Sequence, residues 1–313
     1  MGSIFERRVS RSSLAAGALL LCALGAAVAT PQLLGTRVGS ALGTLGRADP
    51  RYLWLAAAGF TLTVVGSAGS WRCAIGLCDG RTTLADATAR FGVGSLVNTF
   101  IPARAGDAVR IGLFSRLVPG DHPLWTAGGA FAALGAARAV VLGALVLAGA
   151  LAGAVPLWPL LVAAAVAAAA IVAAVRARRS RAHLLDAFRA LSTDPRAAAR
   201  LVAWVTLSVA GRLAGATAIG AAVGIHDPLL AALIILPALD VSGIVPLTPG
   251  NLGVASGAIA VAVHTHGISF NNGLATGITF QAVETAVGLA IGIAGVLRLA
   301  TVPKVRVPVP SEG

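Results

Sequence analysis

Long apolar runs separated by short polar stretches recur along the whole sequence. About 20 consecutive apolar residues cross the hydrocarbon core of a bilayer as one helix, and only helices or closed barrels satisfy their backbone there. The pattern therefore predicts an all-α, polytopic membrane protein with about seven or eight membrane helices. The predicted spans are "LAAGALLLCALGAAVA" near the N-terminus and approximately residues 52–70, 124–151, 157–175, 201–223, 229–245 and 274–297.

Composition supports this class. Of the 313 residues, 57% are hydrophobic and only 12% are charged, and the mean hydropathy is +0.86. The basic residues, almost all Arg, stand mainly between apolar runs, where they set orientation and meet anionic lipid headgroups. They show none of the aromatic interleaving typical of RNA-binding surfaces, so we expect no nucleic-acid partner.

The distribution of Arg predicts the orientation. Residues 176–200 carry a dense group of Arg, which marks a cytoplasmic loop. If the N-terminus is inside, the only basic residues outside the spans that face outward are Arg37, Arg47 and Arg51. We therefore expect a cell-membrane protein with both termini in the cytoplasm. Ala27-Val28-Ala29 resembles a signal-peptidase site, but given the other spans we expect a retained first helix.

Two segments do not fit a simple series of crossings. Residues 72–123 must begin and end on the same side, yet residues 84–101 are largely apolar, so this run is re-entrant or lies at the interface. The run at 254–263 is too short to cross alone. We expect one or two re-entrant segments, a single membrane domain over residues 1–300, and a basic, disordered cytoplasmic tail at 301–313.

An internal repeat connects these two segments. When Val97–Arg110 is laid over Val241–Val254, Pro102 meets Pro246, Gly106 meets Gly250, and Asp107 meets Asn251. Interrupted segments at corresponding places in two halves are a sequence indication of a transporter's binding site. Two ordinary loops, each punctuated by Pro and Gly, are the alternative interpretation.

Charged residues beside or inside the apolar runs are the candidates for chemistry. Arg104 and Arg110, with Asp107 between them, have the donors to bind a phosphate; they would otherwise be topological anchors. Arg138 lies in mid-span, and Glu284 in the last span is its expected partner, with Arg212 and Asp240 as further candidates. A structural ion pair is the alternative.

No catalytic constellation is recognisable, so we expect a non-enzyme without cofactor or metal. His226, His264 and His266 have no Cys, Asp or Glu at ligand-like spacing, apart from Asp227 directly after His226. The sequence also has no phosphate-binding loop of the kind that binds ATP.

Two stretches, "NTFIPARAGDAVRIGLFSR" and "PLTPGNLGVASGAI", resemble the signature regions of the lysylphosphatidylglycerol synthase transmembrane, or flippase-like, family. Members share an N-x-x-x-P-x-R-x-G-[DE]-x-x-R core and a later P-x-x-P-G-x-[LI]-G segment. The resemblance extends over approximately residues 15–300. It implies a helical domain that moves a lipid with an anionic or polar headgroup between leaflets; in the best-known relatives this lipid is an aminoacylated phosphatidylglycerol.

Relatives often carry a soluble synthase domain, which we do not expect here, so a separate lipid-modifying enzyme would be the partner. The alternative function is a membrane-bound transferase or accessory protein acting on phospholipids or polyprenyl-phosphate-linked sugars. The chain departs from many relatives around Arg138, where it reads "AARAV", and in the last span, where Gln281 and Glu284 replace an Arg. The predicted substrate-binding residues are Asn98, Pro102, Arg104, Gly106, Asp107, Arg110, Arg138, Pro246, Pro249, Gly250, Asn251 and Glu284.

Overall fold

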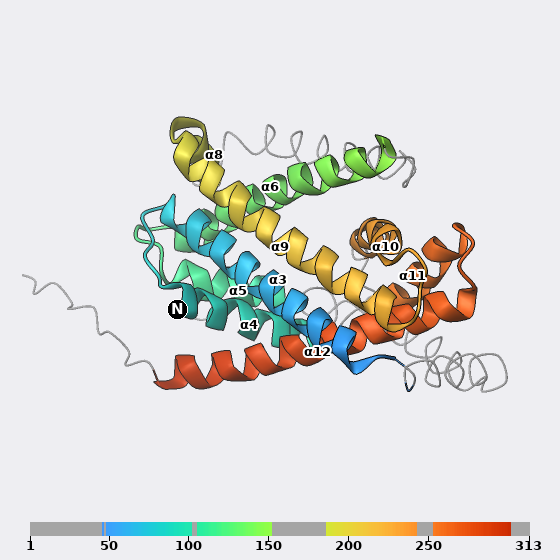
Figure 1. Ribbon diagram of the computed structural model, residues 1–313. Helices are drawn as coiled ribbons and strands as arrows, with labels where there is room; N and C mark the ends of the chain where they lie inside the picture. Colours follow the sequence, from blue (N-terminus) through green and yellow to red (C-terminus); the bar gives the residue numbers. More distant parts are fainter. Residues whose placement is uncertain (1–45, 47, 102–104, 152–185, 243–252, 302–313) are drawn as a thin grey trace, which may run out of the picture.

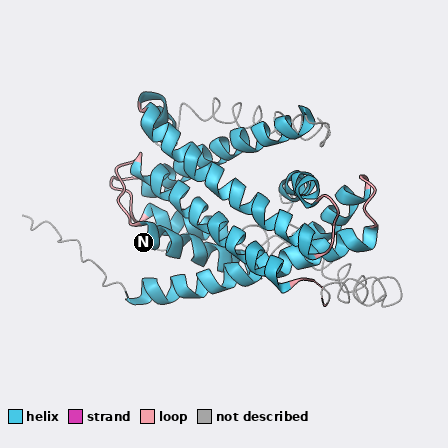
Figure 2. Ribbon diagram, viewed as in Figure 1, coloured by secondary structure: helices cyan, strands magenta, loops and turns pink. Residues whose placement is uncertain are grey.

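The computed structural model describes residues 46, 48–101, 105–151, 186–242 and 253–301, and these residues form helices joined by short turns, with no strand among them (Figures 1 and 2). The all-α prediction is therefore confirmed for the described part of the chain. The helices are α3 (Pro50–Gly76), α4 (Leu84–Phe100), α5 (Ala105–Ser115), α6 (Pro123–Leu151), α8 (Asp186–Thr193), α9 (Pro195–Ala222), α10 (Pro228–Ser242), α11 (Val254–His264) and α12 (Phe270–Thr301).

Helices α3, α6, α9 and α12 are long and apolar enough to cross a membrane. Each coincides with one of the predicted spans to within about two turns at either end. Helices α10 and α11 are shorter apolar helices. The predicted first span and the span at 157–175 lie outside the described residues.

The starts of several helices follow from local sequence. Asp49 and Asp194 stand before Pro50 and Pro195, and their carboxylates accept hydrogen bonds from the backbone N–H groups of the first turns of α3 and α9. Asp is a favoured N-cap, and Pro fits the first helical position because it has no N–H to leave unpaired. The Asp-Pro pairs therefore fix where these long helices begin.

The centre of the bundle is the contact between α3 and α9, which cross the middle of Figure 1. Gly59 lies beside Gly215 and Gly69 beside Trp204, so the two helices run antiparallel. At Gly66 an added Cβ would come within 2.6 Å of the Ser208 backbone nitrogen, which shows how closely the two backbones approach. Small residues permit this close packing between membrane helices.

Helices α4 and α5 form a hairpin that starts and ends at the same end of the bundle. A buried cluster joins the end of α3, the start of α4 and the end of α5 through Ile75, Ala87 and Phe114. Trp71 is only 3% exposed and stacks on Phe114 with ring centroids 4.5 Å apart. The helix continues past Trp71 to Gly76 because α5 and α6 cover this face.

The order of elements in the first half recurs in the second. A long helix, two short helices and another long helix follow one another in α3–α6 and again in α9–α12. Because α3 and α9 are antiparallel, the two halves have inverted orientations. The two short helices are connected by residues 102–104 in the first half and by residues 243–252 in the second, and both connections lie outside the described residues. This order of helices agrees with the predicted internal repeat.

Candidate functional site

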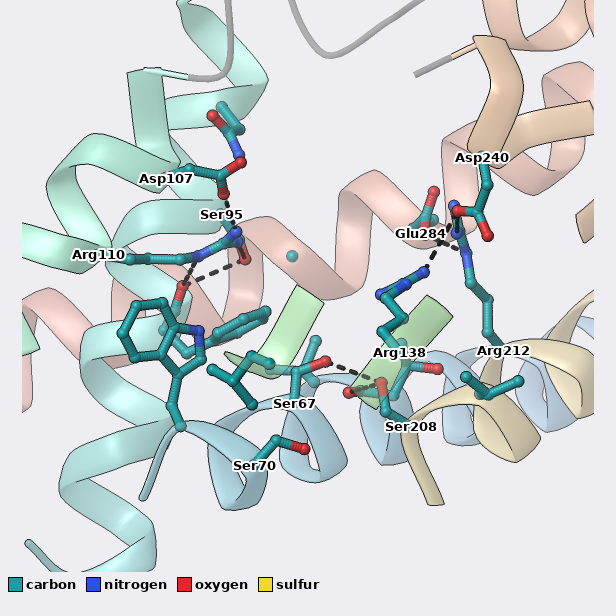
Figure 3. A pocket seen from close by; sticks show the side chains of 18 of the residues that line it. Ser67, Ser70, Ser95, Asp107, Arg110, Arg138, Ser208, Arg212, Asp240 and Glu284 are labelled. Atoms are coloured by element: carbon teal, nitrogen blue, oxygen red, sulfur yellow. Dashed lines mark hydrogen bonds and ion pairs between the residues drawn. The ribbon is translucent and has the colours of Figure 1, made fainter. Parts of the chain in front are cut away.

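A cavity of about 550 Å³ lies between the two halves, and every described helix except α8 contributes to its lining. Residues on both sides of the two interrupted positions reach it: Ile101 and Asp107 in the first half, and Asp240 and Ala255 in the second. The lining includes three Arg and three carboxylates, so its formal charges balance: Arg110, Arg138, Arg212, Asp107, Asp240 and Glu284. Figure 3 shows these charges in two groups on opposite sides of the cavity.

The first group is centred on Arg110 of α5. Its guanidinium pairs with Asp107, donates to the Ser95 hydroxyl at 2.7 Å and to the Phe91 carbonyl at 3.3 Å, and stacks over the Phe91 ring. The Arg110 side chain is only 12% exposed. Because all three guanidinium nitrogens have partners within the hairpin, Arg110 mainly ties α5 to α4.

Asn98 and Gly106 form a further contact between α4 and α5. The Asn98 side-chain oxygen accepts a hydrogen bond of 2.6 Å from the Gly106 N–H, in the first turn of α5. A Cβ at Gly106 would overlap the carbonyl oxygen of Gly94. Gly106, predicted from the sequence to be a substrate-binding residue, lets α5 approach α4 closely in the structure.

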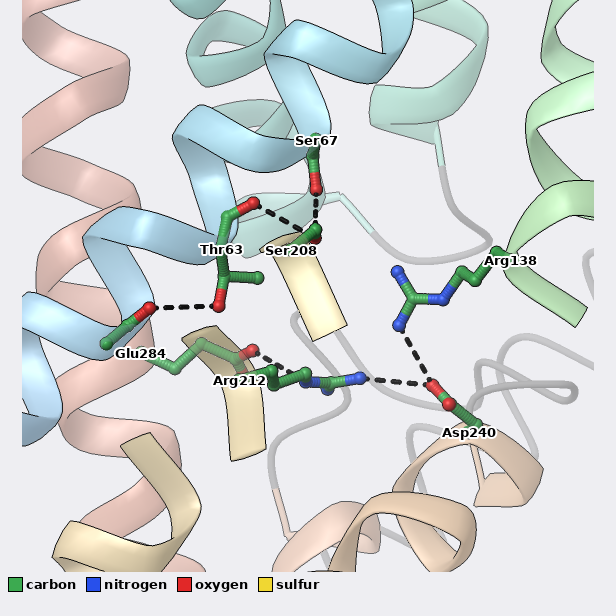
Figure 4. A network of polar contacts seen from close by, with 8 residues as sticks. Thr63, Ser67, Arg138, Ser208, Arg212, Asp240 and Glu284 are labelled. Atoms are coloured by element: carbon green, nitrogen blue, oxygen red, sulfur yellow. Dashed lines mark hydrogen bonds and ion pairs between the residues drawn. The ribbon is translucent and has the colours of Figure 1, made fainter. Parts of the chain in front are cut away.

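The second group is a chain of alternating charges from four helices (Figures 3 and 4). Arg138 of α6 and Arg212 of α9 both donate to the same oxygen of Asp240, at 3.3 and 3.0 Å. Arg212 also pairs with Glu284 of α12 at 3.4 Å. The predicted direct pair of Arg138 with Glu284 is wrong. Asp240 and Arg212 lie between them in the chain, because α10 brings Asp240 to the side of Arg138.

A row of hydroxyl groups lines α3 between the two charged groups. Thr63, Ser67 and Ser70 recur at helical spacing on one face, and Ser208 of α9 meets Ser67 at 2.8 Å. Ser208 also donates to the Thr63 carbonyl, while Ser70 donates to the Gly66 carbonyl. These hydroxyls were not predicted as site residues, although their i, i+4, i+7 spacing in an apolar span indicates a polar face.

Gln281 of α12 positions the start of α11. Its side-chain oxygen accepts hydrogen bonds from the Ser256 hydroxyl at 2.5 Å and from the Gly253 N–H at 3.3 Å, and it is 7% exposed. Asn98 has the same relation to the start of α5 in the first half. An amide side chain thus satisfies the first backbone N–H groups of the second short helix in both halves.

The structure brings six of the predicted site residues to or next to the cavity: Asn98, Gly106, Asp107, Arg110, Arg138 and Glu284. Arg212 and Asp240, named from the sequence only as further candidates, connect Arg138 to Glu284. The other predicted residues lie outside the described part of the chain: Pro102, Arg104, Pro246, Pro249, Gly250 and Asn251. Among the described residues, no three His, Cys, Asp or Glu side chains gather as a metal site would require.

One further ion pair lies away from the cavity, between the first turn of α4 and the end of α12. Arg298 donates to Asp86 at 2.9 Å. The hydrogen bond from the Thr83 hydroxyl, followed by that from Arg298 and its charge, holds the pKa of Asp86 below its ordinary value, against the opposing effect of partial burial.

Antiparallel apolar helices around a charged internal cavity define a multi-pass helical membrane protein. Residues 13–292 match the family described as the lysylphosphatidylglycerol synthase TM region. This chain belongs to that family, as its two signature stretches indicated. No curated protein sequence matches the chain.

Proposed function

We propose that this protein binds the polar headgroup of a membrane lipid in the central cavity and moves the lipid between leaflets. The observation that carries the proposal is the cavity itself, with six ionisable side chains among membrane-length helices. Ionisable groups within membrane segments are costly and usually line a substrate pathway or a water-filled cavity. Membership of a family named for a lipid synthase's membrane region supports a lipid as the cargo.

Arg138 is the phosphate-binding residue in this proposal. Its side chain is 39% exposed and contacts Asp240 through only one terminal nitrogen, Nη2. The remaining N–H groups are available to a phosphate, for which a planar guanidinium is well suited. Arg110, whose nitrogens serve the hairpin, is the less suitable of the two.

The two pairs of short helices would be the re-entrant segments. Helices α4 and α5 return to the end of the bundle where Arg72, Arg116 and Arg200 also lie, whereas Arg51 lies at the opposite end of α3. The concentration of Arg supports a cytoplasmic position for this end. In this arrangement the halves approach the cavity from opposite leaflets, which is the geometry that inverted repeats use for alternating access.

The test is leaflet exchange of acyl-labelled phospholipids in proteoliposomes. We expect wild-type protein to accelerate exchange and Arg138→Gln to lose most of that acceleration, at equal reconstitution. Arg200→Gln is the matched control, because Arg200 is a surface residue with a 70% exposed side chain. Exchange by Arg138→Gln at the wild-type rate would exclude the proposed phosphate site.

The same vesicles separate transport from chemistry. We propose that this chain is a transporter and that any lipid modification is made by a separate enzyme. Mass spectrometry of the recovered lipids should therefore show unchanged species after exchange. New lipid species formed together with loss of the donor would instead identify a transferase.

A further inference from the structure

The four-charge chain Arg138–Asp240–Arg212–Glu284 is unequally exposed along its length. Its two ends are the most accessible members: the side chains of Arg138 and Glu284 are 39% and 40% exposed. The inner members, Asp240 and Arg212, are 31% and 16% exposed. The chain therefore presents a cation at one end and an anion at the other, while its middle is more enclosed (Figure 4).

The inner residues contact each other and the two ends of the chain. One oxygen of Asp240 is shared by two guanidinium groups, and its other oxygen is buried without a hydrogen-bond partner among the described residues. Arg212 stands between two carboxylates and approaches the Phe280 ring at 5.8 Å. The inner pair is thus neutralised by its neighbours.

The end residues retain unused polar atoms. Arg138 contacts Asp240 through Nη2, and Glu284 contacts Arg212 through Oε1 alone, so Glu284 Oε2 has no partner among the described residues. Both side chains line the cavity. Thr63 and Ser67 also line the cavity. The Thr63 hydroxyl donates its proton to the Gly59 carbonyl and the Ser67 hydroxyl bonds to Ser208, so both oxygens can accept a hydrogen bond from a ligand.

We propose that the cavity selects lipids whose headgroup carries one phosphate and one ammonium group, with the phosphate at Arg138 and the ammonium at Glu284. This inference rests on the proposed function and specifies its cargo as zwitterionic phospholipid. The balance of three Arg and three carboxylates in the lining agrees with a cargo of no net charge. A headgroup with two ammonium groups would lack a second accessible carboxylate oxygen without a partner, and a purely anionic headgroup would leave Glu284 Oε2 unused.

The size of the cavity fits this cargo. Its volume of about 550 Å³ lies within the range of small-molecule sites, approximately 300–1,000 Å³. The headgroup can therefore occupy the cavity while the acyl chains remain outside it.

The experiment compares three acyl-labelled lipids in proteoliposomes: phosphatidylethanolamine, phosphatidylglycerol and lysylphosphatidylglycerol. We expect wild-type protein to exchange the zwitterionic lipid about tenfold faster than either other lipid, the factor expected for one charge-assisted hydrogen bond. Glu284→Gln should remove this preference by slowing exchange of phosphatidylethanolamine while sparing phosphatidylglycerol. Asp86→Asn, a carboxylate removed outside the cavity, should leave the preference intact.

A uniform slowing of all three lipids by Glu284→Gln would assign Glu284 a structural role and overturn the inference, as would equal wild-type rates or a preference for lysylphosphatidylglycerol. A second measurement separates the inference from transport: the thermal shift of purified protein on adding each short-chain lipid. A shift specific to phosphatidylethanolamine and lost in Glu284→Gln, without leaflet exchange, would support the site and exclude transport. If no lipid produces either a thermal shift or leaflet exchange, both proposals are excluded.

Discussion

The two charged groups facing the cavity have similar chemistry but different uses of their donors. Arg110 directs its guanidinium into its own hairpin, toward Asp107, Ser95 and the Phe91 carbonyl. Arg138 reaches across the bundle to Asp240 and remains 39% exposed. A membrane arginine can thus stabilise local structure or remain available to a ligand, and the number of its engaged nitrogens distinguishes the two cases.

The largest expected difference between the groups is in stability. Arg110→Met removes the partner of a mostly buried carboxylate, so we expect a loss of about 3–5 kcal/mol in the free energy of unfolding. Arg138→Met leaves Asp240 paired with Arg212, so its loss should be about 1 kcal/mol or less. Denaturant titration in detergent measures both values. Equal losses would contradict the distinction between a structural and an available arginine.

The close approach of the hairpin helices gives the next effect. Gly106→Ala places a Cβ against the Gly94 carbonyl, which is backbone and cannot move aside easily, so we expect a loss of about 3 kcal/mol. Gly112→Ala is the matched control on the same helix, because nothing lies within 4 Å of its Cβ. It should be neutral or stabilise the protein by up to about 1 kcal/mol. Melting temperatures of the two variants compare them directly.

The second half of the molecule can be tested through Gln281. Gln281→Leu leaves the Ser256 hydroxyl and the Gly253 N–H without this acceptor, for an expected loss of about 1–3 kcal/mol. The neighbouring Thr285→Val is its control, since Thr285 lines the cavity and its side chain has no hydrogen-bond partner among the described residues. If unfolding measurements show no difference between them, α11 does not depend on Gln281.

The smallest effect concerns Asp86 and depends on pH. Because the folded-state pKa of Asp86 is lowered, its contribution to stability is present above the unfolded value of about 3.9 and is lost as the pH falls through the folded pKa. We expect Asp86→Asn to lower the melting temperature slightly at pH 7 and to converge with wild type at acidic pH. A constant difference from pH 7 to pH 3 would contradict the assigned hydrogen bonds.

Local sequence determined much of the architecture. Apolar runs of membrane length predicted α3, α6, α9 and α12, since a chain in lipid must satisfy its own backbone. The parity of the Arg-rich segments required residues 72–123 to return to their starting side, and the hairpin of α4 and α5 does so. The signature stretches were sufficient to indicate the family, which the match over residues 13–292 shows.

Tertiary structure alone decided which charges meet. The sequence placed Arg138, Arg212, Asp240 and Glu284 in or near separate apolar segments, and choosing pairs among them required the rotation and approach of four helices. The same holds for Gly106, whose neighbour is Gly94 of α4, and for the hydroxyls of α3 that meet Ser208 of α9. Hydrophobic length is a property of one segment, whereas an ion pair depends on side chains that only packing brings within reach.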